Sequence, residues 1–312
     1  MTLPTENPKI LLICFDNIGD LIFCSSLISP LKSKYPTAQI DLWCKDYTKE
    51  VAERFPYINQ VFNSDTPWDK SPGRDKGSWM KFISTLLGIR KRSYDTIIVC
   101  SPHWTSAASS WFLKSKQRIG FSSKRGDYFL TTSCHPIDRS KKISNELCRL
   151  LTPLDIEASK PFVQINKKNH TKNDKPTAII HPFAGNPSRC VPIALWLKLA
   201  DKLTEAGWIV KLTGTPEEHK RIQKHLPVKP NILNTHQVFP DEATIFFGHD
   251  SGPTHIASAL GIPIFAAYFD SAKPKENLPQ GSSPSSIYRT DGKNFDDFLS
   301  LAFEFAKVHI ES

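Results

Sequence analysis

The chain has 312 residues, of which 39% are hydrophobic and 23% are charged, and its 40 Lys+Arg and 31 Asp+Glu give a formal net charge of +9. The apolar fraction is too high for a disordered chain, and the length suggests two domains of about 150 residues each. The longest apolar runs, such as 10–15 and 264–269, have six residues. A membrane-spanning helix needs roughly 20, so the sequence argues against a membrane-spanning protein.

The N-terminus and the cysteines favour a cytoplasmic protein. Residues 1–7 lack a basic segment, and the apolar run after them ends at Asp16 without a small-residue cleavage site, so we do not expect export by a signal peptide. The seven cysteines are widely spaced and contain no Cys-x-x-Cys pair. This spacing argues against a disulfide framework or a zinc knuckle, and we expect reduced thiols.

The excess positive charge belongs to the first half of the chain. Residues 1–172 hold 26 Lys/Arg against 16 Asp/Glu, whereas the remainder holds 14 against 15. Residues 114–142 alone carry eight basic side chains and two acids. Such a patch suits nucleic acid, an anionic membrane surface or a phosphorylated substrate, although it could also be a solvated face that only aids solubility.

Short apolar runs alternate with amphipathic stretches along the first half of the chain, in the order βαβα. The pattern predicts strands at 10–15, 39–44 and 96–100, and helices at 21–35, 48–55 and 145–151.

A polar stretch at 166–176, where the charge balance also changes, is the candidate linker. After it the alternation restarts, with predicted strands at 178–180, 209–212, 244–247 and 263–268, and helices at 193–206, 216–226, 252–260 and 295–308. The sequence therefore predicts an α/β protein with two doubly wound, Rossmann-like domains, 1–170 and 171–312, that face one another across a cleft. The terminal helix is a candidate to pack back on the first domain. In such folds ligands bind at the carboxyl ends of the strands, which directs attention to the loops there.

The first such loop runs from Asp16 to Asp20 and precedes a helix. Gly19 permits a tight turn and close backbone approach, and Asp20 could either cap the helix or serve as a carboxylate facing the cleft. The loop lacks the Gly-x-Gly-x-x-Gly spacing of a dinucleotide fingerprint.

Two loops of the second half are compatible with phosphate. In residues 181–189 the small side chains let the backbone approach a ligand, and Arg189 is suited to bidentate phosphate contact. In residues 248–255 the Ser251 hydroxyl and the amides at a helix N-terminus form a potential anion site. Together the two loops indicate a diphosphate.

Other readings of the 248–255 loop remain open. Ser251, His255 and Asp250 could imitate a hydrolase triad, but the Gly-x-Ser-x-Gly elbow is missing. His249, Asp250 and His255 could bind a metal, yet their spacing matches no familiar ligand pattern. A capped helix with a buried histidine would also give this sequence.

The loops, taken in order, resemble glycosyltransferase family 9, the ADP-heptose:lipopolysaccharide heptosyltransferases. The resemblance covers nearly the whole chain and rests on these motifs: the run 10–20 with Leu31, Tyr35-Pro36 and Ile40-Asp41; Arg118-Ile119-Gly120-Phe121; His181-Pro182; Pro192 with Trp196; the turn 214–218; and residues 250–255 followed by Ala257, Ala259-Leu260-Gly261 and Pro263. Arg189 stands where the family usually has a lysine, and Val191 stands where a tryptophan is usual.

The resemblance implies a GT-B fold and an inverting transfer of heptose from ADP-L-glycero-D-manno-heptose to an inner-core sugar of lipopolysaccharide, with no cofactor or metal required. It favours Asp20 as the catalytic base. It assigns donor binding to the C-terminal domain, where Glu218 would bind the ribose, through His181, Gly185, Arg189, Glu218, Asp250, Ser251, Gly252, Pro253 and His255. Acceptor binding falls to the N-terminal domain, through Gly19, Arg118, Lys124, Arg125 and Lys141.

The partners expected from this reading are an ADP-sugar, a phosphorylated lipopolysaccharide core acceptor and the inner face of the cytoplasmic membrane, with the protein peripheral to it. Nucleic acid is not expected, because the basic half has no aromatic-basic motif or recognition helix. The alternatives are transfer of another sugar, transfer to a protein or small-molecule acceptor, and a non-catalytic GT-B binder of anionic lipid.

Overall fold

The computed structural model describes residues 6–69, 76–158, 161–168, 174–223, 232–235, 239–269 and 277–309. The chain divides into two compact units, residues 1–166 and 167–312. Part of the linker expected at 166–176 lies outside the described residues, as does the end of the helix expected at 216–226.

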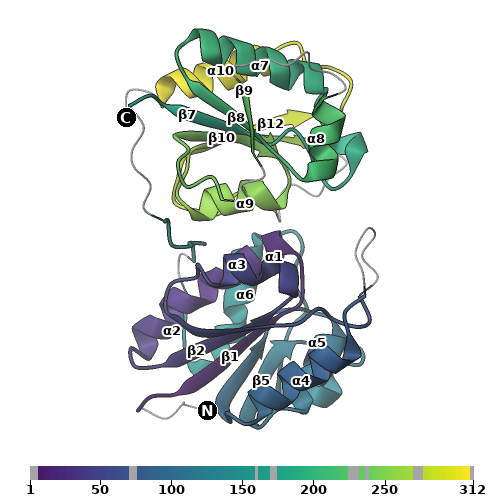
Figure 1. Cartoon of the computed structure of the whole chain (residues 1–312). Coiled ribbons are helices and arrows are strands. Elements are labelled where there is room, and N and C mark those ends of the chain that lie inside the picture. Colours follow the sequence, from purple (N-terminus) through teal and green to yellow (C-terminus); the bar gives the residue numbers. More distant parts are fainter. Residues whose placement is uncertain are drawn as a thin grey trace. The chain divides into compact units, whose positions relative to one another are not determined.

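The first unit is a parallel sheet with helices on both faces (Figure 1). Its strands are β1 (Lys9–Cys14), β2 (Gln39–Cys44), β3 (Ile58–Asn63), β4 (Tyr94–Val99), β5 (Ser115–Phe121) and β6 (Thr132–Cys134). Its α-helices are α1 (Ile18–Cys24), α2 (Ile28–Lys34), α3 (Lys49–Ala52), α4 (Trp79–Arg90), α5 (Trp104–Trp111) and α6 (Ile143–Cys148).

The second unit repeats this architecture. Its strands are β7 (Thr177–Ile180), β8 (Ile209–Thr213), β9 (Ile232–Thr235), β10 (Ile245–His249), β11 (Ile264–Phe269) and β12 (Ser285–Thr290). Its α-helices are α7 (Ile193–Glu205), α8 (Pro216–Gln223), α9 (Gly252–Ala259) and α10 (Phe298–Val308).

Both sheets have the same strand order. The first is β3-β2-β1-β4-β5-β6, and the second, read in the same sense, is β9-β8-β7-β10-β11-β12. In each, the order reverses between the first and fourth strands of the unit, β1 and β4 in one and β7 and β10 in the other, which are parallel neighbours. Ligands of doubly wound sheets bind at the carboxyl ends of the strands beside this reversal. Ligand sites are therefore expected in the loops after β1, β4, β7 and β10.

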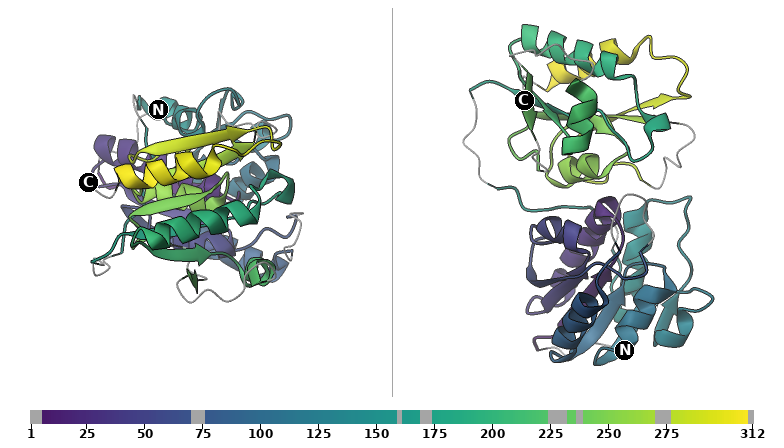
Figure 2. Two further views of the ribbon diagram at one scale, coloured as in Figure 1. Left: turned by 90° about the horizontal axis from the view of Figure 1, so that it is seen from above. Right: turned by 45° about the vertical axis from the view of Figure 1, so that its right-hand side comes forward.

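Each unit has its own apolar core. In the first, Leu11, Ile13 and Ile97 of the sheet pack with Phe82 and Ile89 of α4. In the second, α7 and α10 lie side by side over one face of the sheet, and the ring of Trp196 meets that of Phe298 edge-on at 4.8 Å (Figure 2). The expected return of the terminal helix to the first domain stays a prediction.

The helix expected at 21–35 is interrupted. A 3₁₀ turn at Ser25–Leu27 separates α1 from α2. The hydroxyls of Ser25 and Ser26 donate to the carbonyls of Ile22 and Phe23, and Pro30 has no amide to continue the α-helical ladder. Serine hydroxyls that bond back to the preceding turn and a proline without an N–H both favour a local tightening of the helix.

Candidate functional site

The carboxyl edge of the second sheet brings together the two loops expected to bind phosphate. The amide of His181, directly after β7, donates to the carbonyl of Phe247 in β10 at 2.8 Å. This bond continues the strand pairing and carries His181 to the loop that follows β10. Two segments about 70 residues apart in the sequence therefore meet at the reversal of strand order.

Ser251 lies at the junction of these loops. It is the N-cap residue of α9, yet its hydroxyl makes no capping bond to the helix. Instead Ser251 Oγ lies 3.4 Å from His181 Nδ1 and 3.4 Å from Thr254 Oγ1. Thr254 in turn donates to the carbonyl of His249 at 2.5 Å. The hydroxyl is thus held at the start of α9, where the amides and the helix dipole favour an anion.

Glu218 joins this network from a third loop. Its Oε2 lies 3.8 Å from His181 Nε2 and accepts the amide of Thr215 at 2.8 Å, while the amide of Glu218 donates to Thr215 Oγ1 at 3.2 Å. The reciprocal bonds form a capping box at the start of α8. Burial tends to raise the pKa of the Glu218 carboxyl, but bonding to His181 and Thr215 outweighs it and lowers that pKa below its usual value.

A small cavity of about 150 Å³ opens beside these residues. Gly185 and Arg189 line it from the loop after β7, Asp250 from the loop after β10, and Ala267 and Phe269 from β11. Asn186 accepts hydrogen bonds from the Ser188 amide and hydroxyl, and its carbonyl accepts the Arg189 amide at 3.0 Å, which orders the turn that carries the guanidinium. A partly buried cation and a small cavity at a strand-order reversal can bind a phosphate group.

The two histidines after β10 have different surroundings. His255 is buried, and its Nε2 lies 3.6 Å from Asp250 Oδ1. His249 is completely buried, its Nε2 accepts the Val191 amide at 2.9 Å, and burial lowers its pKa to about 3. His249 is therefore a neutral core side chain. Among the described residues, no cluster of three His, Cys, Asp or Glu side chains could hold a metal ion. The hydrolase-triad hypothesis requires Ser251 to contact His255, whereas Ser251 Oγ lies next to His181.

In the first unit, Asp20 occupies the first turn of α1, after β1. The N-cap position of that helix is held by Asn17, whose side chain makes no capping hydrogen bond, and the Asp20 side chain is exposed. Gly19 lies in the same turn.

A second carboxylate, Asp16, lies at the same edge and was not predicted. Burial raises its pKa, against the lowering electrostatic effects of the nearby His103 and Lys45 side chains. Ser101 and His103 follow β4, the parallel neighbour of β1. No short motif links these residues in the sequence; only the pairing of β1 with β4 could have placed them together.

The residues expected to bind the acceptor differ in their contacts. Arg118 on β5 is half-buried and donates from Nε to the Phe129 carbonyl at 2.9 Å, so it braces the following loop. Lys124 and Arg125 are exposed on that loop, and Arg125 lies over the ring of Trp104 at 5.8 Å. Lys141 is exposed and lies 3.5 Å from Asp138.

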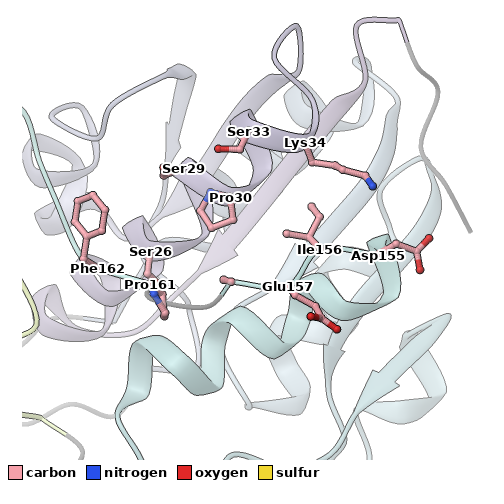
Figure 3. A pocket seen from close by; sticks show the side chains of 11 residues that line it. Ser26, Ser29, Pro30, Ser33, Lys34, Asp155, Ile156, Glu157, Pro161 and Phe162 are labelled. Carbon is pink, nitrogen blue, oxygen red and sulfur yellow. The ribbon is translucent and has the colours of Figure 1, made fainter.

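A larger hollow of about 440 Å³ lies elsewhere in the first unit, beside α2 (Figure 3). Ser29, Ser33 and Lys34 line it from α2, and Asp155 and Glu157 line it from a later segment. None of the residues assigned to donor or acceptor binding contributes to it.

Comparison with known proteins identifies the family. A model of glycosyltransferase family 9, the heptosyltransferases, matches residues 83–283, more than half of the chain. The chain belongs to this family. The lipopolysaccharide heptosyltransferase 3 of Escherichia coli is 24% identical over 277 residues, covering 80% of each chain. The lipooligosaccharide heptosyltransferase 2 of Haemophilus influenzae is 24% identical over 320 residues, covering 91% of this chain and 90% of its own.

Solved structures of family 9 share the fold. The family 9 glycosyltransferase from Veillonella parvula aligns with a TM-score of 0.82 at 16% identity and covers 100% of this chain and 99% of its own. The Escherichia coli heptosyltransferase WaaC with ADP aligns with a TM-score of 0.79 at 14% identity, covering 96% and 99%. The predicted GT-B fold with two Rossmann-like domains is therefore confirmed.

As a member of family 9, the protein is a glycosyltransferase, which confirms the predicted enzyme class. The family match includes the loops around Arg189, Glu218 and Ser251 but begins after Asp20. The roles of individual residues stay predictions. No helix within the described ranges is long and apolar enough to cross a membrane.

Proposed function

We propose that the protein transfers heptose from ADP-L-glycero-D-manno-heptose to an inner-core sugar of lipopolysaccharide, with inversion at the anomeric carbon. The observation that carries this proposal is the convergence of Ser251, His181 and the Arg189 cavity where the strand order of the second sheet reverses. The lipopolysaccharide heptosyltransferases among the family 9 relatives support the choice of sugar and pathway.

The second unit would bind the donor. The Ser251 hydroxyl and the Gly252 amide would contact the diphosphate at the positive end of α9, whose second position, Pro253, has no N–H of its own to satisfy. Arg189 would neutralise charge on the same group, and Glu218 would reach the ribose hydroxyls as the acceptor of their hydrogen bonds. His181, Gly185, Asp250 and His255 shape and hold these loops.

Asp20 would act as general base. The acceptor hydroxyl oxygen attacks the anomeric carbon as its proton passes to the Asp20 carboxylate, and the bond from that carbon to the ADP oxygen breaks, so that ADP leaves with the electron pair. The charge that develops on ADP is stabilised by Arg189 and α9 more strongly in the transition state than before it. A single in-line displacement needs one carboxylate and no covalent intermediate.

The first unit would bind the acceptor. Gly19 leaves room beside Asp20, while Arg118 orders the loop on which Lys124 and Arg125 stand and Lys141 adds a further cation. Exposed cations suit a phosphorylated sugar core. Because that acceptor is anchored in lipid, we place the enzyme in the cytoplasm, peripheral on the inner face of the cytoplasmic membrane.

Release of ADP tests the proposal. Purified protein incubated with ADP-heptose and a lipid A core acceptor should release ADP, and omission of the acceptor should reduce release to the background rate. ADP-glucose with the same acceptor, and ADP-heptose with a protein acceptor, are the matched controls. Release with a control pair but not with the heptose and core pair would overturn the assignment of substrates, and no release with any pair would favour a non-catalytic binder.

A further inference from the structure

Helix α4 is apolar on two faces. Phe82 and Ile89 are buried against the core of the first unit. Met80, Ile83 and Leu87, which follow one another at helical spacing, are 83%, 49% and 51% exposed. A helix that packs on a core with one face normally presents polar side chains on the other. The apolar outer face of α4 therefore indicates an interaction surface.

The exposed apolar side chains continue from α4 onto the end of α5. Trp79, at the start of α4, is 60% exposed, and Trp111 and Phe112, at the end of α5, are 53% and 51% exposed. Arg90, the last residue of α4, donates to the Phe112 carbonyl and joins the two helix ends. In Figure 1 the two helices lie on the same side of the sheet. We call this set the α4–α5 apolar surface: Trp79, Met80, Ile83, Leu87, Trp111 and Phe112.

A basic hollow of about 400 Å³ borders this surface at the amino ends of β1, β4 and β5. Its charged lining consists of Lys9, Arg92, Lys114 and Lys116 with the carboxylate of Asp95. Arg92 lies two residues beyond α4, and Lys114 lies two residues beyond Phe112. Lys116 pairs with Asp95 at 2.8 Å and Arg92 pairs with Asp41 at 3.4 Å, so the charges of Lys9 and Lys114 give the hollow its positive excess.

We propose that the α4–α5 apolar surface and the basic hollow dock the first unit on a bilayer that contains anionic phospholipid. The tryptophan and aliphatic side chains would enter the boundary between head groups and acyl chains, while Lys9 and Lys114 contact lipid phosphates. Membrane binding through this surface does not depend on the donor or acceptor proposed above.

Charge favours lipid over a second copy of the chain. A symmetric dimer through this surface would offer the cations of the basic hollow only apolar side chains or further cations of the partner, because its carboxylate, Asp95, already pairs with Lys116. Like charges brought together at an interface oppose association, whereas an anionic bilayer attracts every one of them.

The direction of α4 determines how far the apolar surface extends. A helix that links β3 to the parallel strand β4 runs from the carboxyl edge of the sheet to its amino edge. The α4–α5 apolar surface therefore extends from the carboxyl edge of the first sheet to its amino edge.

Vesicle co-sedimentation tests this surface. The full-length protein should bind vesicles of phosphatidylglycerol and phosphatidylcholine, and bind phosphatidylcholine vesicles much less. The double variant Met80→Ser/Leu87→Ser should bind about tenfold more weakly because it removes two inserted side chains. In the double variant Lys9→Ala/Lys114→Ala, the affinity for anionic vesicles should fall about fivefold for each charge removed. Its vesicle affinity should also depend less on salt concentration than that of the parent.

Matched controls come from the second unit. Leu301→Ser/Val308→Ser changes two side chains of α10 that are 48% and 69% exposed, and Lys198→Ala/Lys293→Ala removes two exposed lysines. These variants should bind vesicles as the parent does, and all variants should keep the thermal unfolding midpoint. All four double variants should also release ADP at the parent rate with a deacylated, water-soluble acceptor. A loss of vesicle binding can therefore be distinguished from a loss of the proposed sugar transfer.

Three results would overturn the proposal. The first is absence of binding to the anionic vesicles, and the second is an equal loss of binding in the α10 control. The third is a dimer in analytical ultracentrifugation that Met80→Ser/Leu87→Ser abolishes while vesicle binding persists, which would make the surface a contact between copies.

Discussion

Asp20 stands in the first turn of α1, three residues after Asn17 at the N-cap position. The Asp20 side chain is exposed. Its removal should therefore change chemistry more than stability. This separation makes Asp20 a suitable residue for testing the base assignment.

Asp20→Asn keeps the size of the side chain but cannot accept the acceptor proton. We expect kcat for ADP release to fall by about 10²- to 10⁴-fold, with the unfolding midpoint unchanged. Glu50→Gln, at an exposed acid in the first turn of α3, is the matched control and should retain full activity. A rate for Asp20→Asn close to that of the parent would remove Asp20 from the mechanism.

Arg189 borders the cavity that we assign to the donor phosphates. Arg189→Ala should lower kcat by about 10²-fold, because the charge on departing ADP is then left unmatched, whereas Arg189→Lys should recover part of the loss. Steady-state kinetics separate kcat from KM. Arg289→Ala, at an exposed arginine of β12, controls for loss of a cation. An increase in KM alone would assign Arg189 to ground-state binding.

His249 predicts a pH dependence of stability. Its pKa is lowered from 6.5 to about 3 because burial disfavours the charged ring. Between these values the unfolded chain binds a proton that the folded chain does not, so stability is fully present above pH 6.5 and is lost as the pH falls. The loss is roughly 1.4 kcal/mol per pH unit below 6.5.

His249→Gln removes the titrating ring while keeping an acceptor for the Val191 amide. The free energy of unfolding, measured by denaturant titration between pH 4 and 7, should be less steep in pH for this variant than for the parent. Identical slopes in the two proteins would mean that His249 does not account for the loss.

The sequence pointed to some positions that the fold brings together, and missed others for a physical reason. Arg189 was assigned from loop chemistry and Asp250 from the family resemblance, and the two line one cavity. Asp16 and Ser101 were missed because they follow β1 and β4, 85 residues apart in the sequence, and their proximity depends on the pairing of these strands, which no local pattern reveals. The bracing role of Arg118 was hidden because its partner is a backbone carbonyl.

At the scale of elements, most interior strands were predictable and the edge strands were not. The seven predicted strands are present, and their long apolar runs reflect burial on both faces. Five strands were not predicted: the edge strands β3, β6, β9 and β12, and the interior strand β5. In β3 and β12 most side chains are partly exposed, so their sequences lack a continuous apolar run. Helix α4 escaped prediction because apolar side chains on two faces obscure its periodicity.

The capping box of α8 gives a prediction at this scale. Thr215→Ala should lower the free energy of unfolding by about 0.5–2 kcal/mol, because the amide of Glu218 loses its acceptor. Glu218→Gln should remove a contribution that is present above the ordinary carboxyl pKa of 4.5 and is lost as the pH falls through the lowered value in the folded protein. Denaturant titration at pH 7 and pH 3 measures both.

The neighbouring exposed acid, replaced in Glu217→Gln, is the control for the capping box and should have little effect at either pH. If Glu218→Gln and Glu217→Gln lower the free energy of unfolding by the same amount at pH 7, the carboxylate of Glu218 does not act as a cap.

At the scale of the whole molecule, two units with the same strand order carry different charge. Residues 1–166 hold 23 Lys/Arg against 16 Asp/Glu, whereas residues 167–312 hold 17 against 15. This division agrees with the proposed assignment of a phosphorylated, lipid-anchored acceptor to the first unit and a nucleotide sugar to the second. The division of roles follows from charge and loop chemistry together, since the folds of the two units are alike.

Mass spectrometry of the acceptor tests the central claim most directly. After incubation with ADP-heptose, a lipopolysaccharide core acceptor should gain the mass of one heptose in the presence of the parent protein and remain unchanged with Asp20→Asn. An acceptor that keeps its mass with the parent protein, or gains heptose equally with both proteins, would contradict the account.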